Sequence, residues 1–210
     1  MLEKLGYKIK DNVNSLEKEL KNNNFCFLFA QFHHKAMKHV INVRKLLGTR
    51  TIFNLLGPLT NPANTKKQLL GVYEKKWVKL HCEVLKELGS NHSMIVHGDD
   101  GLDEISLSGI THVAELNENK INEYIFDPKD FGYKYINNND IQGGDAQYNA
   151  KKFIEMLEGN NKKFQFVVEL NAGAALYISG KAKNLKEGFE LSRYVIENKI
   201  SKNYLEKIIS

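Results

Sequence analysis

The chain has 210 residues, of which 42% are hydrophobic and 26% are charged. This length and balance are typical of one folded domain and exclude a disordered chain. The net charge of +5 comes from lysines spread among glutamates, without a basic stripe interleaved with aromatic residues, so nucleic-acid binding is not expected. We therefore expect a single domain over residues 1–210.

The start of the chain and its two cysteines bear on the cellular compartment of the protein. No basic segment followed by an apolar one opens the sequence, and the longest apolar run, Phe25–Ala30, is far too short for a membrane span. Cys26 and Cys82 are far apart in apolar surroundings, which favours reduced core thiols over a disulfide or metal site. We expect a cytoplasmic protein with no membrane partner.

The first part of the chain predicts a helix, a strand and a second helix. Asn14 and Glu17 form a capping-box pattern that opens a short helix. The continuous apolar run 25–29 has the length of a strand covered on both faces, as in a parallel sheet. Apolar residues at helical spacing over 35–47, followed by Gly48, predict the next helix.

The middle of the chain repeats the order of strand and helix. Strands are expected at 67–73 and 93–96, with a helix at 77–88 between them. Two further strands, at 110–116 and 121–126, are separated by a turn-like segment and suggest a β-rich flap.

The last third predicts a long loop followed by helices. Residues 127–144 are polar and rich in turn-forming residues. Apolar periodicity predicts helices at 146–158, 164–179, 185–199 and 202–209. Strands alternating with helices first, and helices last, predict an α/β fold with a mixed, mostly parallel sheet flanked by helices.

The first candidate site is a segment rich in histidine at a predicted strand end. His34 and His39 are five residues apart and fall on different helix faces, with no cysteine or carboxylate nearby, which argues against a metal site. Arg44 is the better ligand for an anion, because its planar guanidinium can hold a carboxylate by two bonds. From the residues alone, a surface arginine is the simpler interpretation.

The second candidate is a rigid turn. Gly57-Pro58 breaks an apolar run and Asn61-Pro62 closes it, and both dipeptides restrict the backbone. Gly57 permits close approach of the backbone to a ligand, although an ordinary rigid connection explains the pattern equally well.

The third candidate is the acidic segment 97–104, which directly follows a predicted buried strand. Asp103 and Glu104 supply hard oxygen ligands of the kind that Mg²⁺ prefers, and one or two carboxylates suffice when a substrate phosphate supplies the rest. A solvated acidic turn is the simpler interpretation of this segment by itself.

Taken together, these segments resemble the motifs of the anthranilate phosphoribosyltransferase family. The matching segments are His34 with 36–38, then 42–44, 50–54, 56–62, 103–104, 143–146 and 170–177. The resemblance covers almost the whole chain. It implies the fold of the C-terminal domain of nucleoside phosphorylases and phosphoribosyltransferases.

The resemblance implies transfer of phosphoribosyl from 5-phosphoribosyl 1-pyrophosphate to anthranilate, a step of tryptophan biosynthesis. Arg44 would then hold the anthranilate carboxylate and His34 would lie beside the ring. Gly57 and Pro58 would form part of the same pocket.

The resemblance also implies a metal cofactor. Asp103 and Glu104 would hold Mg²⁺ on the pyrophosphate. Since loss of pyrophosphate leaves negative charge on the leaving group, catalysis would consist mostly of positioning and metal stabilisation. No catalytic residue is assigned.

The sequence departs from the family at several points. It contains neither the glycine-rich GTGGD phosphate loop nor the KHGNR segment nor the small helical domain that precedes them, and Lys35 follows His34 where the family has proline. Gly143-Gly144-Asp145 is not a substitute, because it follows a polar run and starts a predicted helix. We therefore expect an N-terminally truncated domain that does not turn over alone and needs a complementing N-terminal half. Whether the chain forms a homodimer stays open.

Two other functions also stay open. The chain could be a non-catalytic module that binds a small aromatic acid, or a relative of the pyrimidine nucleoside phosphorylases. Replacing Arg44 with alanine separates them, because only the transferase and the acid-binding module predict lost affinity for a carboxylated aromatic compound.

Overall fold

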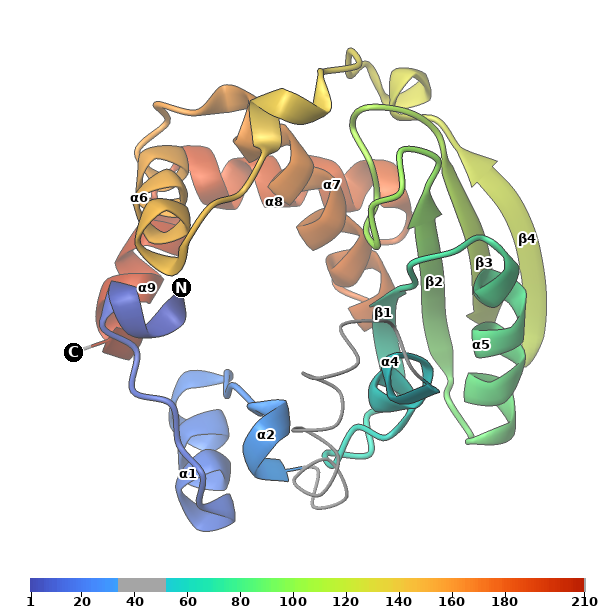
Figure 1. Cartoon of the computed structure of the whole chain (residues 1–210), viewed down its shortest axis with the longest axis horizontal. Coiled ribbons are helices and arrows are strands. Elements are labelled where there is room, and N and C mark those ends of the chain that lie inside the picture. The colour runs from blue at the N-terminus through green and yellow to red at the C-terminus, as the bar shows by residue number, and fades with distance from the viewer. Residues whose placement is uncertain (34–51, 210) are drawn as a thin grey trace.

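The computed structural model describes residues 1–33 and 52–209, which form a four-stranded sheet with helices on both faces and a helical group near the start of the chain (Figure 1). The strands are β1 Lys67–Gly71, β2 His92–Gly98, β3 Thr111–Asn117 and β4 Lys120–Phe126. The helices are α1 Val13–Asn23, α2 Ala30–His33, α4 Ile52–Leu56, α5 Lys76–Glu87, α6 Ala146–Leu157, α7 Lys162–Ser179, α8 Leu185–Glu197 and α9 Ile200–Ile209. Short 3₁₀ turns are η1 Leu2–Leu5, η2 Gly57–Leu59, η3 Pro128–Phe131 and η4 Asn138–Ile141.

The strand order in the sheet is β1-β2-β3-β4. β1 pairs with β2 in parallel, whereas β2 with β3 and β3 with β4 are antiparallel. The predicted mixed sheet flanked by helices is confirmed. One of these three strand pairs is parallel, so the described part of the sheet is not mostly parallel.

The strands β3 and β4 do not form a separate flap as predicted. They continue the main sheet, with Ala114 of β3 opposite Ile95 of β2. The physical reason is the burial of β3 on both faces, which a flap exposed to solvent would not provide. β4, by contrast, is the edge strand, and four of its seven residues are exposed.

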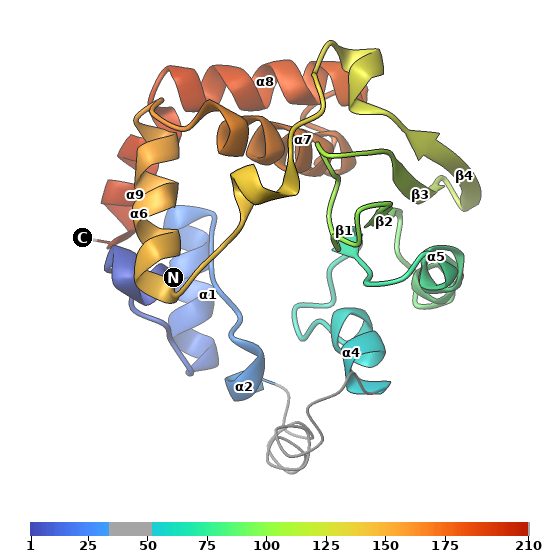
Figure 2. The ribbon, with the colours of Figure 1, turned by 45° about the horizontal axis from the view of Figure 1, so that its top comes forward.

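The sheet has an apolar core on each face, because successive residues of a strand point to opposite sides. Met94 of β2 packs in a cluster with Leu170 of α7, whereas its neighbour Ile95 packs in a second cluster with Cys82 of α5. Figure 2 shows α7 and α8 on one side of the sheet and α5 on the other. Coverage of both faces explains why the sequence of β2 is apolar without alternation.

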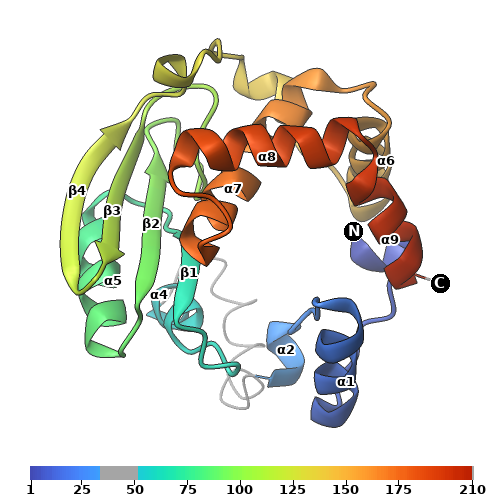
Figure 3. The same ribbon diagram turned by 180° about the vertical axis from the view of Figure 1, so that it is seen from behind.

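A third cluster joins the C-terminal helices to the start of the chain. Met156 of α6, Ile196 of α8 and Leu205 of α9 are buried together, and Leu5 of η1 packs against them. Figure 3 shows η1 beside α9. The predicted C-terminal helices are confirmed, and each begins within two residues of its expected start.

The predicted strand over 25–29 is wrong. The segment is not part of the sheet, and the amide of Phe27 donates to the hydroxyl of Tyr7 at 3.3 Å. The ring of Phe25 contacts Tyr7, and those of Phe27 and Phe29 stack on each other. Aromatic packing therefore covers the apolar run in place of neighbouring strands, an ambiguity that short apolar runs always carry.

The first helix is also capped by a different residue. Asn12, and not Asn14, caps α1, since its side chain accepts from the amides of Asn14 at 2.9 Å and Ser15 at 3.3 Å. The predicted helix over 35–47 lies outside the described residues. Among those that the structure describes, no helix is both long and apolar enough to cross a bilayer.

Candidate functional site

The acidic loop lies at the carboxyl end of β2, as predicted. Asp103 is exposed and Glu104 is half-buried. The loop rests directly on β1, because a Cβ added at Gly71 would overlap the carbonyl oxygen of Asp103. Glycine at position 71 therefore permits an approach that any side chain would prevent.

The electrostatics of this loop suit a cation. Burial raises the pKa of the Glu104 carboxyl, and the negative charges of Asp103 and Asp100 raise it further. Carboxylates that repel one another in a partly desolvated place are hard oxygen donors whose repulsion a divalent cation would relieve. The residues present thus fit Mg²⁺.

The loop alone does not complete a metal site. Over residues 1–33 and 52–209, no group of three or more His, Cys, Asp or Glu side chains is arranged to hold a metal ion. Mg²⁺ commonly binds one or two carboxylates and takes its other ligands from substrate phosphate and water. Asp103 and Glu104 match that kind of site.

The loop is anchored to α7 by Asn171. The amide of Ile105 donates to Asn171 Oδ1 at 2.9 Å, and Asn171 Nδ2 donates to the carbonyl of Ile105 at 3.0 Å. The same Nδ2 donates to the carbonyl of Val167 at 3.0 Å. Two of these three bonds hold Ile105, the residue that follows Glu104, and the third fixes the Asn171 side chain on its own helix.

A second network closes the loop on itself. Ser106 Oγ donates to Asp100 at 2.6 Å and accepts from the amide of Ser108 at 2.9 Å, while Thr111 Oγ1 accepts from the amide of Ser106 at 3.0 Å. Because its carboxylate is bonded to Ser106, Asp100 shapes the loop and adds charge without being the best-placed metal ligand.

The Gly57-Pro58 turn is η2, which follows α4 and packs on α5. His81 of α5 holds the preceding segment, with Nε2 3.1 Å from the carbonyl oxygen of Leu55, and Leu59 packs against the core on the α5 face. A Cβ added at Gly57 would meet no atom of residues 1–33 or 52–209 within 4 Å, so the described part of the chain leaves space beside this turn. Such a surface can form a pocket wall.

The other two predicted acceptor residues, His34 and Arg44, lie outside the described residues. Their predicted roles therefore stay predictions. The structure brings Asp103 and Glu104 together in one loop and attaches Gly57 and Pro58 to a different element, α5.

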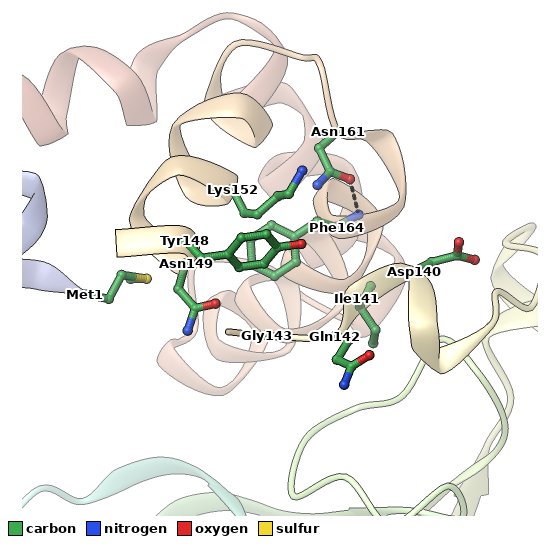
Figure 4. Close-up of a pocket in the computed structure, with 10 residues that line it drawn as sticks. All are labelled: Met1, Asp140, Ile141, Gln142, Gly143, Tyr148, Asn149, Lys152, Asn161 and Phe164. Atoms are coloured by element: carbon green, nitrogen blue, oxygen red, sulfur yellow. Dashed lines mark hydrogen bonds between the residues drawn. The ribbon is translucent and has the colours of Figure 1, made fainter. Parts of the chain in front are cut away.

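A separate cavity of about 320 Å³ lies between the segment before α6 and the starts of α6 and α7 (Figure 4). Its lining includes Gly143, but none of the predicted site residues that lie in the described part of the chain. The amide of Gly144 donates to Asn149 Oδ1 at 2.8 Å, and Asp145 caps α6 by accepting from the amide of Tyr148 at 2.7 Å. The segment starts a helix, as predicted, and the amide of Gly144 and the carboxylate of Asp145 already bond within the chain.

Sequence reasoning missed the residues that position the acidic loop. Asn171 was noted only as part of a matching segment, yet it is a polar residue four positions after Val167 and next to the fully buried Leu170 on a largely apolar helix. That spacing was a usable signal, because a polar side chain on a buried helix face needs partners. Gly71 carried no comparable signal, since its role depends on a loop 32 residues later, at Asp103.

Comparison with known proteins gives a consistent result. Residues 1–199 match the family described as "Glycosyl transferase family, a/b domain". The anthranilate phosphoribosyltransferase of Methanobrevibacter smithii is 45% identical over 209 residues, covering 100% of this chain and 62% of that protein. The one from Thermoanaerobacter sp. is 42% identical over 209 residues, with the same two coverages.

Solved structures agree in fold. Anthranilate phosphoribosyltransferase from Thermus thermophilus superposes with a TM-score of 0.88 at 36% identity, covering 99% of this chain and 62% of that one. The enzyme from Saccharomyces cerevisiae in complex with PRPP and Mg gives a TM-score of 0.88 at 29% identity, covering 99% of this chain and 60% of that one.

The chain spans 62% or less of the length of these relatives. The predicted resemblance to anthranilate phosphoribosyltransferases and the predicted fold type are both confirmed. The match over residues 1–199 and the shared fold show that the chain belongs to the glycosyl transferase family defined by this a/b domain.

Proposed function

We propose that this chain takes part in the transfer of phosphoribosyl from 5-phosphoribosyl 1-pyrophosphate to anthranilate, which gives N-(5-phosphoribosyl)anthranilate and pyrophosphate in tryptophan biosynthesis. The observation that carries the proposal is the acidic loop after β2, where burial and neighbouring charge raise the pKa of Glu104. A relative of the same fold has been solved with PRPP and Mg.

In this proposal, Asp103 and Glu104 bind Mg²⁺, which when bound stabilises the negative charge of the departing pyrophosphate. Their side of the site is held by Gly71 and Asn171, so the carboxylates are positioned before the metal arrives. Positioning before binding avoids an ordering cost at the moment of reaction.

The acceptor side of the site is proposed from the resemblance. Arg44 holds the anthranilate carboxylate, His34 lies beside the ring, and Gly57 and Pro58 form a wall of the pocket. The space that the described residues leave beside Gly57 supports the last assignment.

We further propose that these 210 residues do not turn over by themselves, because their sequence contains neither the glycine-rich phosphate loop nor the KHGNR segment of the family. A complementing N-terminal half would supply both. The free cysteines, Cys26 and buried Cys82, suit a reducing compartment and support a cytoplasmic location.

The metal site can be tested without turnover. Mn²⁺, which is visible by electron paramagnetic resonance, is titrated into the chain in the presence of pyrophosphate. We expect binding that the pair D103N and E104Q weakens by roughly tenfold or more, or at least about 1.4 kcal/mol. The neighbouring exposed carboxylate provides the control, since D99N removes one charge from the same loop and should leave most of the affinity. Equal loss in D99N would contradict a specific site.

Turnover is tested next, by following consumption of fluorescent anthranilate with PRPP and Mg²⁺. We expect none from the chain alone and recovery when an N-terminal half of a relative is added. Turnover by the chain alone would overturn the proposal that it needs a partner, whereas no turnover after complementation would overturn the proposed reaction.

A further inference from the structure

We infer that Asn171 is a positioning residue for the acidic loop, acting from α7 to hold Glu104 where it binds the metal. This inference rests on the proposed function. It comes from a contact between residues 66 positions apart, in which one side-chain amide pairs with both backbone groups of Ile105. The two bonds resemble the pair that one residue of a neighbouring antiparallel strand would exchange with Ile105.

The contact supplies hydrogen bonds that water cannot supply to the buried backbone of Ile105. Ile105 has no exposed surface, so its N–H and C=O would lack solvent partners if Asn171 were removed. Buried backbone groups without partners are costly, and the chain would move to find new ones. The residue that would move with Ile105 is its direct neighbour, Glu104.

The helix that carries Asn171 is itself firmly placed against the sheet. Leu170 and Ala174 of α7 have no exposed surface, and Lys67 Nζ of β1 donates to the carbonyl of Ser179 at the end of the same helix at 2.8 Å. Asn171 therefore fixes the loop at Ile105 relative to α7 and the sheet. Outer partners of this kind orient metal ligands and strongly influence metal affinity.

The loop also has an anchor that does not involve Asn171. Ser106 bonds to Asp100 and to Thr111 without any contribution from Asn171, so both bonds should persist when Asn171 is replaced. Replacement of Asn171 should thus release Glu104 and Ile105 locally without unfolding the loop. This makes a positioning role separable from a general contribution to stability.

Two variants test the inference, with one control. N171L removes all three hydrogen bonds, and N171S keeps a hydroxyl that can bond to the Val167 carbonyl one turn earlier but cannot reach both groups of Ile105. N161A is the matched control, because Asn161 caps the same helix at its start, by accepting from the amide of Phe164 at the first turn, ten residues before Asn171.

Two readouts are needed, one without metal. Amide exchange at Ile105, followed by NMR in the metal-free chain, should be slow in the unaltered chain and in N161A but fast in N171L and N171S. The Mn²⁺ dissociation constant with pyrophosphate should rise about tenfold to a hundredfold in both Asn171 variants. In N161A it should change by less than about twofold, as expected for a distant site.

Each outcome decides the inference. Faster exchange at Ile105 with unchanged Mn²⁺ affinity overturns it, because the contact would then be structural only. Unchanged exchange in both Asn171 variants also overturns it, as does an equal loss of Mn²⁺ affinity in N161A. If the unaltered chain does not bind Mn²⁺ with pyrophosphate, the proposed metal site fails and the positioning role fails with it, a result recognisable before any variant is made.

Discussion

At the scale of single residues, the ionised Glu104 carboxylate destabilises the folded chain, yet the proposed metal site requires it. Its carboxyl is half-buried beside Asp103 and Asp100, and this raises its pKa above the ordinary value. A raised folded-state pKa means that the ionised form destabilises the folded chain, so this residue favours the folded state more as the pH falls through that raised value. Metal binding requires the opposite, ionised form.

This conflict predicts how metal binding depends on pH. As the pH is lowered from 7, protons should begin to compete with Mn²⁺ for Glu104 at a higher pH than they would for an ordinary glutamate, whose pKa is about 4.3. Mn²⁺ titrations with pyrophosphate at several pH values measure the effect. E104Q should bind more weakly and lose this part of the pH dependence, whereas an unchanged pH profile in E104Q would assign the effect to another group.

The same residue predicts a gain in stability. In the metal-free chain at pH 7, E104Q removes a half-buried charge next to two like charges, so it should stabilise the fold by about 0.5–2 kcal/mol in urea unfolding. D99N, at an exposed position paired with His112, is the control and should not stabilise. A destabilised E104Q would mean that the carboxylate has a favourable partner.

At the scale of elements, a buried charge joins the long loop before α6 to two helices. Glu169 of α7 has no exposed surface and accepts from Gln165 Nε2 at 2.7 Å, Arg193 Nε at 3.1 Å and the Tyr133 hydroxyl at 3.1 Å. Tyr133 belongs to the loop and Arg193 to α8. The network therefore holds the polar segment 127–144 on the helical layer.

Replacing Arg193, the cation of this network, should lower the free energy of unfolding. R193M leaves the buried Glu169 carboxyl without its cation. Because the Arg193 side chain is itself 42% exposed, we expect a loss of about 2–3 kcal/mol in urea unfolding, at or below the low end for buried ion pairs. Y133F removes two hydrogen bonds, the one that the hydroxyl donates to Glu169 and the one that it accepts from Arg193, and should cost about 1–2 kcal/mol. If R193M costs no more than Y133F, the ion pair is not what holds this loop.

The hairpin between β3 and β4 carries backbone strain. Glu118 and Asn119 have φ values of 47° and 65°, the left-handed region that a two-residue turn of this type requires. Changing the pair to Asn-Gly should relieve this strain and raise stability by about 1 kcal/mol in thermal or urea unfolding. N122G, within β4, is the control and should instead destabilise by about 0.5–1 kcal/mol. Equal effects at both positions would show that the turn is not strained.

At the scale of the whole molecule, the acceptor side of the proposed site depends on a residue outside the described part of the chain. If Arg44 holds the carboxylate of anthranilate, R44A should lower affinity for it by roughly 1.5–3 kcal/mol, about tenfold or more, in a fluorescence titration. K45A is the control at the neighbouring position, and circular dichroism checks the fold. Unchanged affinity in R44A would remove the carboxylate role and favour a different acceptor.

The amino-acid sequence by itself determined the local structure and the family. Apolar periodicity was enough for the strands within 67–73 and 93–96 and for the C-terminal helices, because helix and strand each bury residues at a fixed local spacing. The motifs around Gly57 and Asp103 were enough for the family. Both depend on residues close together in the chain.

Only the tertiary structure decided which segments meet. The run 25–29 is as apolar as a buried strand but packs through its aromatic rings, and the strands after 110 join the main sheet and do not form a flap. Asn171 and Gly71 support the acidic loop from far along the chain. Hydrogen-bond partners and close approaches over such distances are set by how complete faces pack together, and local spacing carries no information about that.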